Sequence, residues 1–120
     1  MSKEGSITRT RPMTRHQYTE LEERLIEGIR AAESTRDLLK AVRFYYIFLG
    51  GVYLMLRVSD ICKLRFEQVV YPGSIDIREE KTKKARTIKI TEKVANKFRF
   101  GLVRLAAKGI NPRYSDHIIN

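Results

Sequence analysis

Apolar residues recur at helical spacing near the start of the chain. Five of them fall on one face of a helix, because each has another of the five three or four positions away: Tyr18, Leu21, Leu25, Ile26 and Ile29. Thr14 and Gln17 precede most of this run and have the spacing of a capping box. The pattern therefore predicts a helix from about residue 15 to residue 32.

The next segment is apolar at almost every position from Leu38 to about Leu56. Ser34 and Asp37 repeat the capping signature in front of it. A helix with so little polar surface must be surrounded by other elements, so we expect it to be buried. The glycine pair 50–51 near its middle indicates either a close helix contact or a break in the helix.

A short helix is expected after Arg57, with Ser59 as its cap. Its inner face would be formed by Ile61, Cys62 and Leu64. This arrangement puts Arg57 at a junction between two helices, where it is either a cap on the preceding helix or a charge presented to a ligand.

Beyond residue 67 the apolar positions alternate, which is typical of strands. "SIDIRE" directs Ile75 and Ile77 inward, and "ARTIKI" does the same with Ile88 and Ile90. The basic segment "EKTKKA" joins them as a hairpin, and Thr91 then caps a last helix. The inner stripe of that helix is expected to contain Val94, Ala95, Phe98, Leu102, Leu105 and Ala106.

The predicted fold class is thus α+β and mainly helical. Three N-terminal helices are followed by a small antiparallel β-hairpin and a further helix, all within residues 13–120. Residues 1–12 are polar and show no periodicity, so we expect a flexible basic arm or the remains of a linker.

Charge narrows the possible partners. The 120 residues include 24 basic and 14 acidic side chains, for a net charge of +10, while 42% of residues are hydrophobic. Residues 97–113 contain five basic and no acidic side chains, whereas residues 20–37 contain six acidic and three basic ones. A folded domain with such an uneven basic excess is typical of nucleic-acid binding, although a soluble basic domain without a polyanionic partner fits the composition too.

Other features limit the compartment and the cofactors. The single cysteine, Cys62, excludes an internal disulfide and a cysteine-based zinc site, and we expect it to lie in the core. The longest uncharged run lies between Arg43 and Arg57 and is shorter than the roughly 18–20 residues that span a bilayer. The first 12 residues lack the apolar stretch of an export signal, so a cytoplasmic protein without membrane contact is expected.

Three segments together resemble the catalytic domain of the tyrosine recombinases, the phage-integrase family. "LRVSDICKLRFEQV" is similar to the first signature box of that family, where an arginine precedes a small residue and an acidic residue. "MTRHQYTELEERLIEGI" looks like its opening helix, and "EEKTKKARTIKI" resembles its lysine-bearing β-hairpin. The segments occur in the order of the family, and the resemblance covers roughly residues 13–110.

The resemblance implies a chemistry and a role for particular residues. In this family a tyrosine attacks a phosphate of double-stranded DNA and forms a 3′-phosphotyrosine, with no metal or other cofactor. Arg57 matches the arginine that binds the phosphate oxygens, Lys81 the lysine that protonates the leaving oxygen, and Asp60 an acidic position that supports the arginine. Further DNA contacts are expected from Arg11, Arg15, Lys83, Lys84 and Arg86.

The chain also departs from the family pattern. Met55 stands where the family usually has glycine. The helical core-binding domain that usually precedes the catalytic domain has no counterpart in these 120 residues, so we do not expect this chain to clamp DNA from both sides. No His-x-x-Arg box and no nucleophilic tyrosine are identified, and His117 has no arginine three residues later. We therefore expect residues 13–120 to be a partial catalytic domain that does not cleave DNA alone. Exposed apolar surface would favour self-association or contact with other recombinase protomers.

Two other functions fit the same residues. One is a catalytically inactive, integrase-like module that binds DNA or regulates a recombinase. The other is a helical transcription regulator with a β-wing, which would need a helix with exposed base-reading side chains.

Overall fold

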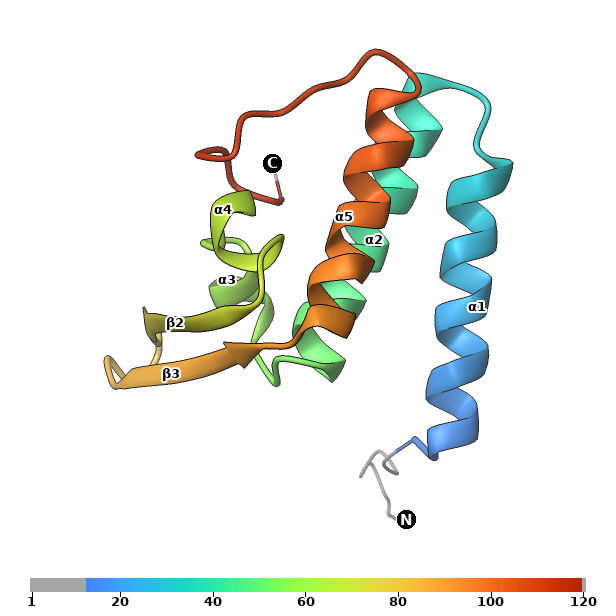
Figure 1. Cartoon of the computed structure of the whole chain (residues 1–120). Helices are drawn as coiled ribbons and strands as arrows, with labels where there is room; N and C mark the ends of the chain where they lie inside the picture. Colours follow the sequence, from blue (N-terminus) through green and yellow to red (C-terminus); the bar gives the residue numbers. More distant parts are fainter. Residues whose placement is uncertain (1–12, 120) are drawn as a thin grey trace.

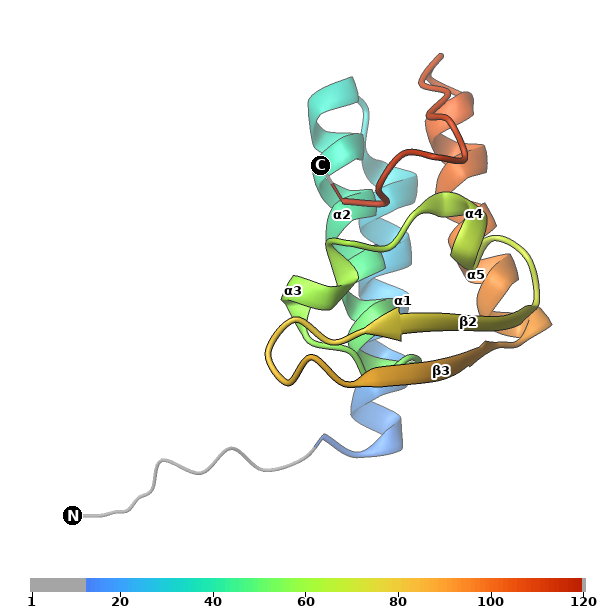
Figure 2. The same ribbon diagram turned by 90° about the vertical axis from the view of Figure 1, so that its left-hand side faces the viewer.

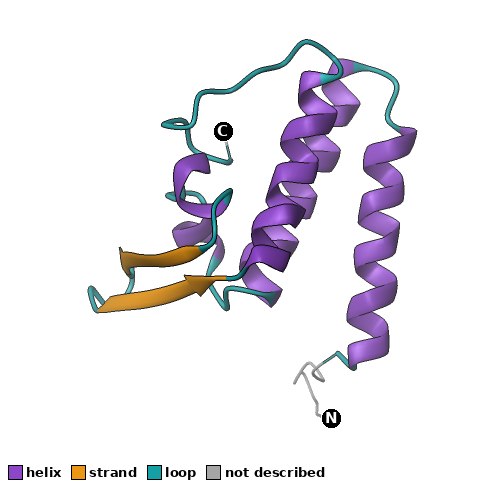
Figure 3. Ribbon diagram, in the orientation of Figure 1, coloured by secondary structure: helices purple, strands orange, loops and turns teal. Residues whose placement is uncertain are grey.

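The computed structural model describes residues 13–119 and is an α+β domain in which helices predominate (Figures 1 and 3). The fold class is confirmed, with four helices rather than three before the hairpin. The elements are α1 (Arg15–Ala31), α2 (Thr35–Val52), α3 (Val58–Ile61), α4 (Phe66–Val69), β2 (Gly73–Arg78), β3 (Ala85–Ile90) and α5 (Glu92–Ala106). The arm expected over residues 1–12 lies outside the described residues.

Helix α2 is the centre of the structure and contacts α1, α3 and α5. The hairpin, α3 and α4 lie on one side of the α2–α5 pair, and α1 lies on the other (Figures 1 and 2). Side chains of α1, α2 and α5 meet in the core, as the nearly complete burial of Ile29, Leu49 and Phe98 shows. Within residues 13–119, every helix is too short or too polar to cross a lipid bilayer.

The three long helices begin where the sequence predicted. Thr14 and Gln17 form the reciprocal capping box, in which each side chain bonds to the backbone N–H of the other residue at 2.8 and 3.1 Å. The hydroxyl oxygen of Ser34 accepts a bond from the Asp37 N–H, and that of Thr91 accepts one from the Val94 N–H. These caps satisfy backbone donors that the first turn of a helix otherwise leaves unpaired.

Helix α2 ends at Val52, about four residues before the predicted end. Leu54 and Leu56 continue the apolar pattern beyond it, but they are buried in a turn that leads into α3. Met55, between them, has φ of 58°, in the left-handed region that side chains disfavour. The apolar run thus continues past the end of the helix because the turn is also buried. For this reason the length of the run predicted a helix that is too long.

The segment after α2 differs from the prediction in two further respects. Helix α3 begins at Val58 with Arg57 as its N-cap, so Ser59 is not the cap. Ile61 and Leu64 are buried as expected, whereas Cys62 is exposed and does not belong to the core.

Helix α4 was not predicted, and it is held by the C-terminal segment. The N–H groups of Phe66 and Glu67 donate to the carbonyls of Asp116 and Tyr114, and the Ile118 N–H donates to the Leu64 carbonyl. These partners lie some 50 residues apart in the sequence, so local sequence patterns do not predict the pairing.

The hairpin has the predicted strands and orientation. β2 and β3 pair antiparallel, with Ile75 opposite Ile88 and Arg78 opposite Ala85. Ile88 and Ile90 are buried, and Ile75 and Ile77 are half-buried, so the apolar face turns toward the helices as the alternation indicated.

A buried carboxylate connects all three long helices. Glu22 of α1 accepts hydrogen bonds from the hydroxyls of Tyr45 and Tyr53, at 2.9 and 2.7 Å, and pairs with the Lys97 ammonium of α5 at 2.5 Å. Burial alone would raise the pKa of Glu22, but these donors outweigh it and lower that pKa. Three donors thus keep the carboxylate charged inside the bundle.

The adjacent glycines of α2 provide a test of its packing. A Cβ at Gly50 would lie 2.6 Å from the Ile61 side chain, whereas one at Gly51 would have no neighbour within 4 Å. We expect Gly50→Ala to lower the free energy of unfolding by about 1–2 kcal/mol, because overpacking exceeds the gain in helix propensity. Gly51→Ala should raise it by about 0.5–1 kcal/mol. Urea denaturation of the two variants measures both changes, and equal effects would contradict the close contact with α3.

Candidate nucleic-acid interface

Arg57 lies at the junction of α2 and α3, where its backbone is fixed and its side chain is exposed. Its carbonyl accepts hydrogen bonds from the Asp60 and Ile61 N–H groups at 3.0 and 2.9 Å. Within residues 13–119, its guanidinium makes no hydrogen bond or ion pair, and so it does not cap the carbonyls of α2. The arrangement leaves the guanidinium open to a ligand.

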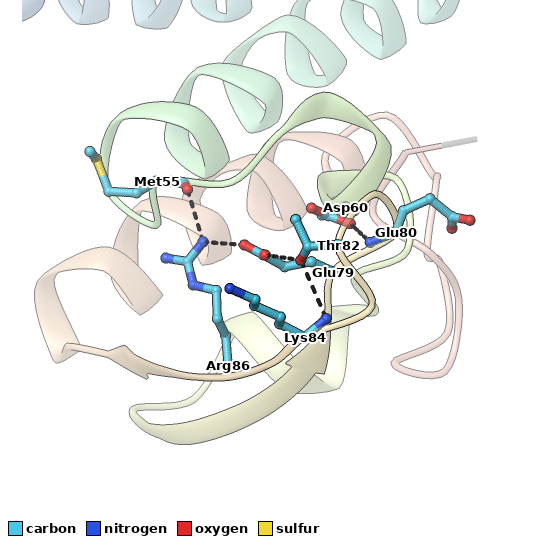
Figure 4. Close-up of polar contacts among 7 residues, drawn as sticks. All are labelled: Met55, Asp60, Glu79, Glu80, Thr82, Lys84 and Arg86. Atoms are coloured by element: carbon cyan, nitrogen blue, oxygen red, sulfur yellow. Dashed lines mark hydrogen bonds and ion pairs between the residues drawn. The ribbon is translucent and has the colours of Figure 1, made fainter.

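Asp60 connects this junction to the hairpin. Its side chain is 4% exposed, and its Oδ1 accepts a 2.9 Å hydrogen bond from the backbone N–H of Glu80 (Figure 4). Lys63 forms an ion pair with the Glu80 carboxylate next to it. Asp60 thus positions the hairpin turn, and in the described part of the chain it makes no bond to the Arg57 side chain. The support of Arg57 that the resemblance implies for Asp60 stays a prediction.

A second contact docks the hairpin through Arg86. Its guanidinium donates to the Met55 carbonyl at 3.3 Å and to the Glu79 carboxylate at 3.0 Å (Figure 4). The left-handed backbone of Met55 occurs where the recombinase pattern has glycine, the residue that adopts this conformation without strain. Arg86 was expected to contact DNA. In the structure its side chain joins the hairpin to the turn between α2 and α3.

Glu79 shows that Arg57 and the hairpin share one electrostatic environment. Its carboxylate accepts from the Thr82 hydroxyl at 2.6 Å and from Arg86. The pKa of Glu79 is lowered, first by the Thr82 hydrogen bond, then by Arg86, with a further contribution from the charge of Arg57. Thr82 and Arg86 thus stabilise the charged form of Glu79, and Arg86 offsets that charge.

The lysines of the turn are exposed. Lys83 has φ of 60°, and its N–H donates to the Glu79 carbonyl, which closes the turn. Its ammonium lies 3.7 Å from the Glu80 carboxylate, an exposed pair of small energetic value. Lys81 and Lys84 have no side-chain partner in the described part of the chain. They are the cations of the turn that remain open to an anion.

Arg15 and Arg11 were also expected to contact DNA. Arg15 is exposed at the first position of α1, and Arg11 lies outside the described residues. Lys63 was not among the predicted site residues. Its ion pair with Glu80 joins the segment directly after α3 to the hairpin turn. The only signal for it was its place three residues after Asp60, one helical turn along, which is too common to stand out.

Four of the six tyrosines have hydroxyls that are buried or hydrogen-bonded. Tyr45 and Tyr46 are buried, and burial raises the pKa of both hydroxyls. Burial and the bond to Glu22 raise the pKa of Tyr53 to about 12. Tyr71 packs edge-on against Tyr114 with ring centres 5.9 Å apart, and the hydrogen bond to Tyr114 raises its pKa. A raised pKa disfavours the phenolate that attacks phosphorus.

No group of three or more metal-binding side chains gathers within residues 13–119. Comparisons of the chain with protein-family models, with curated proteins and with solved structures gave no match.

The bond between Asp60 and the hairpin can be tested by hydrogen exchange. Asp60→Ala removes the acceptor of the Glu80 N–H, and we expect the free energy of unfolding to fall by about 1–3 kcal/mol. The amides of the turn should exchange about tenfold faster or more, because the hairpin opens locally. Asp60→Asn keeps an oxygen acceptor and should restore most of the protection. Unchanged exchange in Asp60→Ala would show that the hairpin is held by other contacts.

Proposed function

We propose that this chain binds double-stranded DNA through Arg57 and the hairpin turn, as part of the catalytic domain of a tyrosine recombinase. The observation that carries the proposal is the docking of a lysine-bearing hairpin beside an exposed arginine whose backbone is fixed. The resemblance in the first signature box and in the hairpin supports the same assignment. Such a protein acts on DNA in the cytoplasm, at the nucleoid if the host is bacterial.

The two side chains suit the chemistry of a phosphate. A guanidinium donates two parallel hydrogen bonds to phosphate oxygens, which a lysine cannot do, so arginine is the appropriate residue at position 57. An ammonium on the hairpin turn, as at Lys81, is suited to donate a proton to a leaving oxygen. In a recombinase both groups act on the same phosphate.

The alternative is a module that binds DNA or regulates a recombinase without chemistry. The raised pKa values of Tyr45, Tyr46, Tyr53 and Tyr71 favour this alternative, because a raised pKa disfavours the phenolate nucleophile. In that case Arg57 and Lys81 contact phosphates as independent cations.

Removal of either cation should weaken DNA binding. We expect Arg57→Ala and Lys81→Ala each to reduce affinity for duplex DNA about tenfold, because each removes a charged contact to phosphate. The dependence of log K on log salt should become shallower by about one per cation removed. Fluorescence anisotropy over a salt series measures both quantities. Lys93→Ala, an exposed cation on α5, is the matched control and should bind as the wild type does.

The double variant separates the two functions. If both side chains contact one phosphate, the losses are coupled and differ from additivity by more than about 0.5 kcal/mol. If they contact separate phosphates, the losses add. Full affinity in both single variants would refute the proposed site.

Cleavage by the described chain is expected to be absent. Incubation with duplex DNA should give no covalent protein–DNA adduct after denaturing electrophoresis, because four of the six tyrosines have raised pKa values and the resemblance identifies none of the six as the nucleophile. An adduct that disappears in one Tyr→Phe variant would identify a nucleophile and overturn this prediction.

A further inference from the structure

Helix α1 presents three carboxylates along one exposed line. Glu20, Glu23 and Glu27 are separated by three and four positions, so they lie on one side of the helix, and all three are exposed. We call them the acidic stripe. Two partly exposed apolar side chains, Met13 and Leu21, lie near its N-terminal end at 38% and 36% exposure.

Helix α2 presents the opposite charge in the same form. Arg36, Lys40 and Arg43 are separated by four and three positions and are exposed. We call them the basic stripe. They line a surface hollow together with Thr35, Leu39 and Phe44, and no carboxylate contributes to its lining. Leu39 and Phe44 are 42% and 50% exposed, so the hollow is partly apolar.

Neither stripe favours the helix that contains it. Like charges three or four positions apart destabilise a helix by a few tenths of a kcal/mol for each pair, and both stripes consist of such pairs. Arg24 offsets part of this on α1, and Asp37, three positions before Lys40, offsets part of it on α2. Arg36 also lies in the first turn of α2, where the helix dipole disfavours a cation. An external surface of opposite charge would remove both penalties.

The two stripes have the same length. The first and last residues of each stripe are seven positions apart, 20 and 27 in one and 36 and 43 in the other, which at a rise of about 1.5 Å per residue is about 10 Å. Side by side, the helices can therefore place each carboxylate next to a cation along the whole stripe.

We propose that a second copy of this chain docks its acidic stripe onto the basic stripe. Met13 and Leu21 of one copy then lie at the edge of the hollow that contains Leu39 and Phe44 of the other copy. The contact is separate from Arg57 and the hairpin, so self-association and DNA binding fail or succeed independently.

Charge reversal tests the proposal without DNA. Arg36→Glu/Arg43→Glu makes both stripes acidic, and Glu20→Lys/Glu27→Lys makes both basic. By sedimentation velocity, the wild type should self-associate, and raising NaCl from about 0.05 M to about 0.5 M should weaken this because salt screens the stripes. Each variant alone should associate at least tenfold more weakly. A mixture of the two variants should associate as well as the wild type does, because each acidic stripe then meets a basic one.

A control variant separates the effect of the stripes from that of net charge. Lys93→Glu/Arg113→Glu changes the net charge as much as the first variant does but lies outside both stripes, and it should associate like the wild type. Circular dichroism verifies that each variant is folded. A monomeric wild type at low salt, variants that associate normally, or a mixture that stays monomeric would each overturn the proposal. If the variants associate normally or the mixture stays monomeric, and Arg36→Glu/Arg43→Glu also binds DNA more weakly, the basic stripe is a DNA contact instead.

Discussion

The hydrogen bond between the buried Asp60 carboxylate and the Glu80 N–H is the contact on which the candidate site depends. A buried carboxylate is costly unless its oxygens are bonded, so this contact selects one position of the hairpin turn relative to α3. The Arg86 bond to the Met55 carbonyl adds a second point of attachment on the preceding turn. A two-stranded hairpin is only marginally stable by itself. These two attachments, one before and one after Arg57 in the sequence, fix the position of the hairpin at the site.

The junction itself follows from the packing of α2. Gly50 allows Ile61 to approach the helix at a distance that any side chain would prevent, so α3 lies directly against the end of α2. The chain must then reverse within residues 53–56, and it does so by placing Met55 in the left-handed region. The strain at Met55 and the exposed position of Arg57 are two consequences of this close approach.

The sequence was most informative where structure is local. Caps and apolar spacing were enough for the start of each long helix and for the strands, because those signals lie within one or two turns of the residues they specify. They were insufficient for the end of α2, since a buried turn and a buried helix are equally apolar. Helix α4 depends on pairing with residues 114–118, which no local pattern specifies. Cys62 directly follows the four-residue helix α3 and is exposed there. The roles of Arg57 and Lys81 at the candidate site stay predictions, whereas the partners of Asp60 and Arg86 depend on the folded hairpin and have no signal in the local sequence.

The distribution of charge around the hairpin is more informative than the net charge of +10. Glu79 is paired with Arg86, and Glu80 is shared between Lys63 and Lys83, so both carboxylates of the turn are compensated by neighbouring cations. Arg57, Lys81 and Lys84 lie in the same region without a carboxylate of their own in the described part of the chain. A phosphate that approaches the hairpin therefore meets uncompensated positive charge, and the paired carboxylates serve to hold the turn in place.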